Sequence, residues 1–176
     1  MQIFFSVFWW IYFFIFFTGY PLLYAFVFLM GKTRSLHHFI TGRIHPLLPL
    51  AYAFVSTLFW ILMISTGRMN FVAERIASTA PSVLIMLFSL SSLLFWLPAF
   101  RKNIKLSFIH SLPLFLLPPS NMIWRIMSHE IVVHDYIIGM LRIYTAGLIV
   151  YTVAIALLLF SKWLSGLLSL RHQSVK

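Results

Sequence analysis

The residues best suited to chemistry lie in one polar stretch, SHEIVVHDY, at residues 128–136. Its ionisable members, His129, Glu130, His134 and Asp135, are of types that bind zinc or act as general acid and base. In the HExxH pattern of zinc proteases, two histidines four residues apart share one helical face. Here the histidines are five residues apart, roughly 140° around a helix, whereas Glu130 and His134 share a face. We interpret the stretch as a polar rim at the entrance to a helix, with zinc binding or catalysis as the alternative.

Three further residues stand at or inside apolar runs. His110 lies within such a run, close to Pro113, and an ionisable residue at membrane depth is a functional candidate. His45 begins the second apolar segment, and two histidines from different helices at matched depth can ligate a b-type haem. The alternative is that His110 bonds a carbonyl freed by the proline. Arg142 is expected at the outer boundary of the last span, where it reaches the headgroups or pairs with Asp135; a gating or substrate-binding arginine is the alternative.

Two periodic patterns accompany these residues. Serines recur on one side of the third apolar segment, at Ser78, Ser82, Ser89 and Ser92. Small residues recur on the last segment, at Gly139, Ala146, Gly147 and Ala154. Both patterns favour close helix–helix contact, and a serine stripe can also line a water path.

The elements that must position these residues are membrane helices. The chain has 176 residues, of which 61% are hydrophobic and 9% charged, and its mean hydropathy is +0.96. A soluble domain carries about 25% charged residues, so lipid is the natural solvent here. The net charge of +10 sits in short clusters between apolar runs, which predicts contact with anionic headgroups and excludes the continuous basic face of a nucleic-acid-binding module.

The apolar runs predict an all-α, polytopic transmembrane helical bundle forming one domain, with the first run retained as a membrane helix. Four uninterrupted spans are expected at residues 3–30, 46–66, 81–100 and 137–160. Pro21 predicts a kink in the first of them. A fifth segment, 104–124, carries three prolines and is expected to be a broken span or a re-entrant segment. The tail, 161–176, is expected to lie at the headgroup level; the longest loop, 67–80, is expected to form another interfacial helix, with Phe71 and Ile76 against the membrane.

Charge placement sets the expected orientation. Five crossings with the N-terminus outside put nine of the 13 Lys and Arg residues inside, whereas four crossings put eight there. The positive-inside rule therefore favours five crossings and a cytoplasmic C-terminus, in a bacterial inner membrane.

The functional prediction is a non-enzymatic integral membrane subunit that oligomerises or anchors a membrane complex. Its expected partners are membrane lipids and either a second copy or another subunit. No resident cofactor is expected, and the absence of cysteine excludes a thiolate metal site. Two alternatives stay open: a channel or transporter component, and a small membrane enzyme or haem- or metal-binding subunit. Small basic membrane proteins of bacterial immunity and phage defence share this composition, but no motif supports that comparison.

Overall fold

The computed structural model describes residues 2–33, 37–65, 80–127 and 133–173, and all regular structure in these ranges is helical. The elements in order are α1 (Gln2–Met30), α2 (His37–Phe39), the π-helix η1 (Ile40–Ile44), the 3₁₀-helix η2 (His45–Leu47), α3 (Leu48–Ser65), α5 (Ala80–Ser91), the 3₁₀-helix η3 (Ser92–Trp96), α6 (Pro98–Arg101), α7 (Ile104–Met127) and α8 (Val133–Gln173). The predicted all-helical fold is confirmed for this part of the chain.

Three of the described helical stretches are long and apolar enough to cross a membrane. They are Phe13–Met30, His37–Ser65 and His134–Ser165. Phe13–Met30 carries no charged residue, whereas the other two stretches carry theirs near the ends of long apolar runs; a backbone in hydrocarbon must satisfy its polar groups within a helix. The structure is therefore compatible with a membrane protein, as the composition predicts.

The third predicted span is divided, so four uninterrupted spans are not confirmed. Residues 81–100 form α5, then η3, then an extended Leu97 with ψ of 135° before α6. The hydroxyls of Ser89, Ser91 and Ser92 donate to carbonyls three residues earlier. Such bonds compete with the regular helical pattern at the point where it tightens into a 3₁₀-helix. Pro98 then forces the residue before it into an extended conformation.

α7 departs from its prediction in the opposite sense, because it is one continuous helix through all three prolines. A proline leaves the carbonyl four residues earlier without its helical donor, and for Pro119 that carbonyl belongs to Phe115. The hydroxyl of Tyr144 on α8 donates to this carbonyl at 3.0 Å. Tyr136, two turns earlier on α8, donates to the carbonyl of Pro118 at 3.1 Å. The Tyr144 bond thus replaces one of the donors that the prolines remove, and the Tyr136 bond adds a further contact between α7 and α8.

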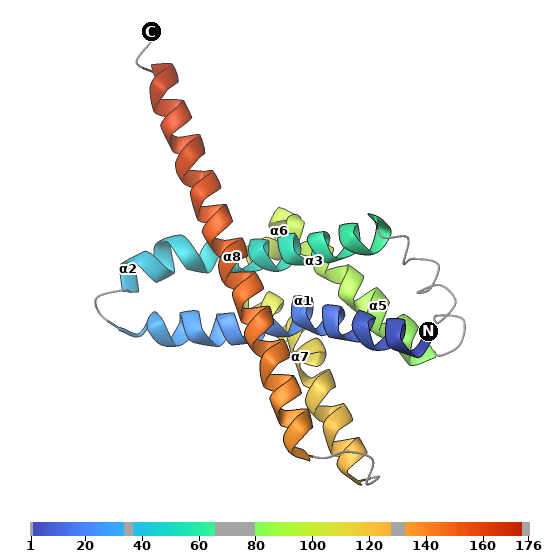
Figure 1. Ribbon diagram of the computed structural model, residues 1–176. Helices are drawn as coiled ribbons and strands as arrows, with labels where there is room; N and C mark the ends of the chain where they lie inside the picture. The colour runs from blue at the N-terminus through green and yellow to red at the C-terminus, as the bar shows by residue number, and fades with distance from the viewer. Residues whose placement is uncertain (1, 34–36, 66–79, 128–132, 174–176) are drawn as a thin grey trace.

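The long helices cross rather than run all in one direction (Figure 1). α1 and α3 lie side by side, and α8 crosses both and packs most extensively on α1. The crossing is close because two glycines meet there. A Cβ on Gly147 would lie 2.8 Å from the carbonyl oxygen of Ile15, and a Cβ on Gly19 would overlap the backbone of Gly147. The predicted small-residue stripe therefore has an intramolecular partner at Gly147, whereas a Cβ on Gly139 would meet open space.

α1 and α8 are each one continuous helix, and α8 is longer than the span predicted for it. α1 continues through Pro21 as one helix. α8 extends unbroken to Gln173, and its C-terminal half projects from the other helices (Figure 1). The tail thus continues the last span, and its location at the headgroup level stays a prediction. The interfacial helix predicted with Phe71 and Ile76 falls outside the described residues.

The core is aromatic and lies where α1, α3 and α8 meet. Phe13, Phe17 and Phe59 are buried, and the two α1 rings pack on Phe59 edge-on, with ring centres 5.7 and 5.3 Å away. Edge-to-face contacts at these spacings add to the stability that apolar burial provides. Trp60 is buried nearby, and its indole N–H has no hydrogen-bond partner among the residues that the structure describes.

Candidate functional site

The polar stretch before α8 is only partly within the described residues. His129 and Glu130 lie outside them, whereas His134 and Asp135 are exposed in the first turn of α8. Arg142, two turns further along, is also exposed. No group of three or more His, Cys, Asp or Glu side chains suited to a metal ion occurs among the described residues. Zinc binding by the full stretch remains a prediction.

The members of the predicted serine stripe whose side chains are described form hydrogen bonds with their own helix. Ser89 and Ser92 are fully buried, and their hydroxyls donate to the carbonyls of Met86 and Ser89. Ser78 and the side chain of Ser82 lie outside the described part of the chain. The buried members therefore direct their protons into the backbone and not toward a water path.

His110 is the sequence-predicted residue that the fold surrounds with polar partners. Its Nδ1 lies 3.0 Å from the hydroxyl oxygen of Tyr52 on α3, and its Nε2 lies 2.7 Å from Oγ of Ser91 on α5. Ser91 in turn donates its proton to the carbonyl of Phe88 at 2.6 Å. The three side chains come from three different elements, so His110 joins α3, α5 and α7.

These partners fix the direction of the hydrogen bonds. Because the Ser91 proton goes to a carbonyl, Oγ of Ser91 accepts from the Nε2–H of His110. The Nδ1 of a neutral imidazole is then an acceptor, and it receives the proton of Tyr52. The network therefore runs from Tyr52 through His110 and Ser91 to the backbone of Phe88, and every donor in it has an acceptor.

Aromatic rings enclose the imidazole. Phe88 stacks on it face to face, with ring centres 4.3 Å apart and an interplanar angle of 6°. Tyr52 and Phe95 present their rings edge-on at 5.7 and 5.6 Å. This surrounding favours a neutral, hydrogen-bonded histidine, since an unpaired charge among apolar groups is costly.

A second polar chain lies beside the first. Tyr20 on α1 stacks on Tyr52 with ring centres 4.6 Å apart, and its hydroxyl bonds Oγ of Ser107 at 2.5 Å. Ser107 donates to the carbonyl of Ile104, so this chain also ends on the backbone. Tyr151 from α8 completes the group, with its ring 5.5 Å from that of Tyr20 and its hydroxyl donating to the carbonyl of Phe16 at 2.7 Å.

The site has the members of a nucleophile–base pair but not its orientation. A serine nucleophile must donate its proton to the histidine that activates it. Ser91 instead accepts from His110. The backbone on both sides of Ser91 is helical, which engages the N–H groups that would otherwise stabilise an oxyanion. In this assignment the His110 network bonds α3, α5 and α7 together.

Haem ligation by His110 and His45 would compete with the hydrogen bonds of His110. Both ring nitrogens of His110 are hydrogen-bonded, so iron would have to displace Tyr52 or Ser91. His45 is half-buried in η2, at the turn before α3. Haem stays an untested alternative, and the site as folded favours hydrogen bonding.

Sequence reasoning identified His110 but missed Tyr52 and Ser91. Tyr52 was hidden in an apolar run, where an aromatic residue usually signals packing or the membrane interface. Ser91 is the neighbour of a stripe member, and the tightening of the helix into η3 accompanies its part in the site. The available signal was weak: a serine in a serine-rich part of one apolar run and a histidine inside another. Comparison of the chain with protein-family models, with characterised proteins and with solved structures gave no match.

Proposed function

We propose that this chain is an integral membrane subunit without enzymatic activity, whose role is to assemble or anchor a membrane complex. One observation carries the proposal: Oγ of Ser91 lies 2.6 Å from the carbonyl of Phe88 and 2.7 Å from Nε2 of His110, which favours a serine that donates to its own helix. The buried residues of catalytic type are thereby engaged in helix contacts, and no base is left beside the serine. The transport alternative has less support, because α7 is unbroken and Ser89 and Ser92 donate to their own backbone.

The outer surface supports the same proposal. Large apolar side chains are exposed along the projecting half of α8, at Leu157, Phe160, Trp163 and Leu164. Only 22% of the apolar window of α8 is buried, against 61% for the window that includes α3. In a membrane this half of α8 is free to pack on lipid, a second copy or another protein. We propose the inner membrane of a bacterium as the location, with five crossings and a cytoplasmic C-terminus.

The test is extraction of the full chain from its native membrane in mild detergent, followed by mass measurement and identification of co-purifying chains. A defined homo-oligomer or a partner in fixed stoichiometry is expected. Replacing Phe160 and Leu164 together by Ala should reduce that assembly. The control is Leu84→Ala on α5, an equally apolar residue that is 68% exposed and should leave the assembly intact.

Two results would contradict the proposal. A chain that stays monodisperse in buffer without detergent would not be an integral membrane protein. A lone monomer with measurable turnover on lipid substrates, lost in Ser91→Ala, would show that the chain is an enzyme.

A further inference from the structure

A basic and aromatic surface surrounds the turn between α1 and α3. Lys32 follows the end of α1, with its Nζ 5.0 Å from the ring centre of Phe28. Arg43 in η1 has its Cζ 5.9 Å from the ring centre of Phe39. All four side chains are exposed, with the phenylalanines at 50% and 46%. We call these four residues the α1–α3 turn surface.

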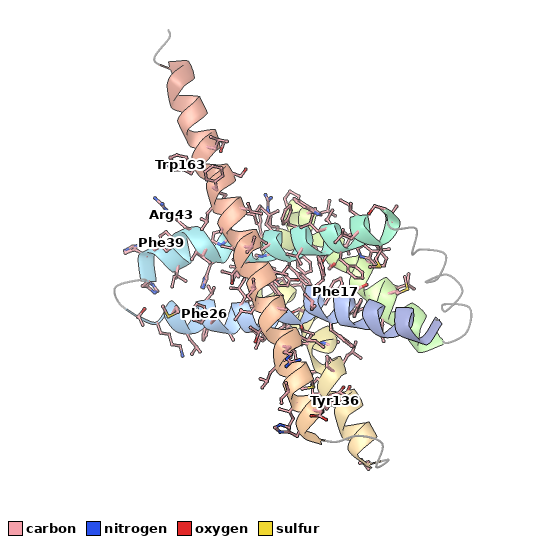
Figure 2. All side chains as sticks on the ribbon, viewed as in Figure 1. Phe17, Phe26, Phe39, Arg43, Tyr136 and Trp163 are labelled. Carbon is pink, nitrogen blue, oxygen red and sulfur yellow. The ribbon has the colours of Figure 1, made fainter. Side chains whose placement is uncertain are left out.

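The depth of this surface in the bilayer follows from the lengths of the helices. The 18 residues of α3 extend about 27 Å at 1.5 Å per residue, which nearly fills a hydrocarbon core of about 30 Å. The candidate span His37–Ser65 has 29 residues, more than a crossing needs, so its first residues, which include Phe39 and Arg43, reach the headgroup layer when α3 crosses the bilayer. Figure 2 shows Phe39 and Arg43 together on the outer side of this segment, near the end of the molecule where α1 finishes.

Contacts join the described residues on the two sides of the turn. His37 donates from Nδ1 to the carbonyl of Gly31 at 2.6 Å, and the hydroxyl of Thr41 donates to the carbonyl of His37 at 2.6 Å. Ile40 is buried and packs so closely on Gly31 that a Cβ there would lie 3.4 Å from its Cγ2. The π-helical bond from the N–H of His45 to the carbonyl of Ile40 spans the residue Arg43. Phe39 and Arg43 therefore lie on a segment that is already helical, which avoids part of the ordering cost of binding.

The charge of the region selects the ligand. The first 73 residues carry cations but not one Asp or Glu. A guanidinium stacked on a ring keeps its edge free, and that edge matches two phosphate oxygens. Phe28 and Phe39 lie beside the cations, and their apolar rings suit contact with the acyl chains that adjoin a phosphate headgroup. We infer that the α1–α3 turn surface binds the phosphate headgroup of an anionic phospholipid, an inference that rests on the proposed membrane location.

The test uses the full chain reconstituted in vesicles that contain spin-labelled phosphatidylglycerol or spin-labelled phosphatidylcholine. The fraction of motionally restricted label reports relative affinity, and phosphatidylglycerol should be preferred. Arg43→Gln and Lys32→Gln should each lower that preference about fivefold. Arg43→Lys should lower the preference less than Arg43→Gln does, because the positive charge is kept although the paired N–H donors of the guanidinium are lost. The matched control is Arg142→Gln, an exposed cation on α8 that is expected at the opposite membrane boundary; it measures the general effect of one charge near the headgroups, and it should lower the preference clearly less than Arg43→Gln does.

Each other outcome has a definite meaning. An equal loss in Arg142→Gln would show a general charge effect and overturn the inference. Displacement of the labelled lipid by soluble glycerol phosphate would indicate a site for free phosphate and overturn the lipid assignment. A chain that inserts into vesicles but shows no headgroup preference overturns this inference alone, whereas a chain that does not insert overturns the proposed function.

Discussion

Replacement of His110 by Phe would test the hydrogen-bonded network directly. A phenylalanine ring can keep the stack on Phe88, so most of the packing is retained. Ser91 keeps its bond to the Phe88 carbonyl, but Tyr52, which is fully buried, loses its acceptor. A buried hydroxyl without a partner costs about 1–3 kcal/mol, while interhelical bonds in membrane proteins average about 0.6 kcal/mol. We expect the free energy of unfolding to fall by about 1–2 kcal/mol.

The second half of the test is the double variant with Tyr52→Phe. Replacing both partners of a buried bond with apolar groups of similar shape is nearly neutral, so most of the stability lost in His110→Phe should return. The interaction energy from the double-mutant cycle should be about 0.6–1.7 kcal/mol. His38→Phe is the control, because His38 is exposed and its change should stay within about 0.5 kcal/mol.

Reversible unfolding in mixed micelles with rising dodecyl sulfate, followed by far-ultraviolet circular dichroism, provides the measurement. The direction of the network gives a second check, since Ser91→Ala should cost less than His110→Phe. Ser91→Ala removes an acceptor from the imidazole but leaves Tyr52 bonded to Nδ1. If the losses in the two single variants simply add in the double variant, Tyr52 and His110 do not share a bond and our account of the site is wrong.

Three further changes test the packing around the site. Gly19→Ala places a methyl group in the backbone of α8 and should force the two helices apart, with loss of the folded state by the same unfolding assay; Gly139→Ala, which meets open space, should be neutral or stabilise by up to about 1 kcal/mol. Tyr144→Phe should cost about 0.6–1.7 kcal/mol, because the carbonyl of Phe115 loses its donor, and an unchanged unfolding midpoint would contradict that. Trp60→Phe should cost less than other losses of buried aromatic volume, since it also removes an unpaired N–H; a loss above about 3 kcal/mol would indicate that the N–H has a partner.

The ends of α1 and the C-terminal end of α3 could be predicted closely because hydropathy decides them, whereas α8 extends 13 residues beyond its predicted end. The first span was predicted at 3–30 and α1 covers Gln2–Met30; the second was predicted to end at residue 66 and α3 ends at Ser65. Uncharged runs bounded by basic residues leave the backbone little choice in lipid. Hydropathy does not report hydroxyls that bond their own helix, so the change from α5 to η3 was missed.

The continuity of α7 was beyond sequence reasoning for a different reason. Three prolines predict a break when the helix is considered alone. A compensating donor comes from Tyr144, which lies 29 residues away from the Phe115 carbonyl that it bonds. The same holds for the site: Tyr52 is 58 residues from His110. Contacts of this kind depend on how helices cross, and the Gly19–Gly147 approach that sets one crossing is visible only in three dimensions.

The tyrosines explain why residues of catalytic type are poor guides to function in this chain. Tyr144 and Tyr151 donate directly to backbone carbonyls of neighbouring helices, and Tyr20 and Tyr52 do so through Ser107 and through His110 with Ser91. A protein with so few charges has few other groups that can bond helices together where water is absent. Each of these hydroxyls is already used in a hydrogen bond that supports the fold, because a backbone carbonyl in hydrocarbon needs a donor. We therefore expect function at the exposed surfaces, at Arg43 and along the projecting half of α8, where side chains are not used in this way.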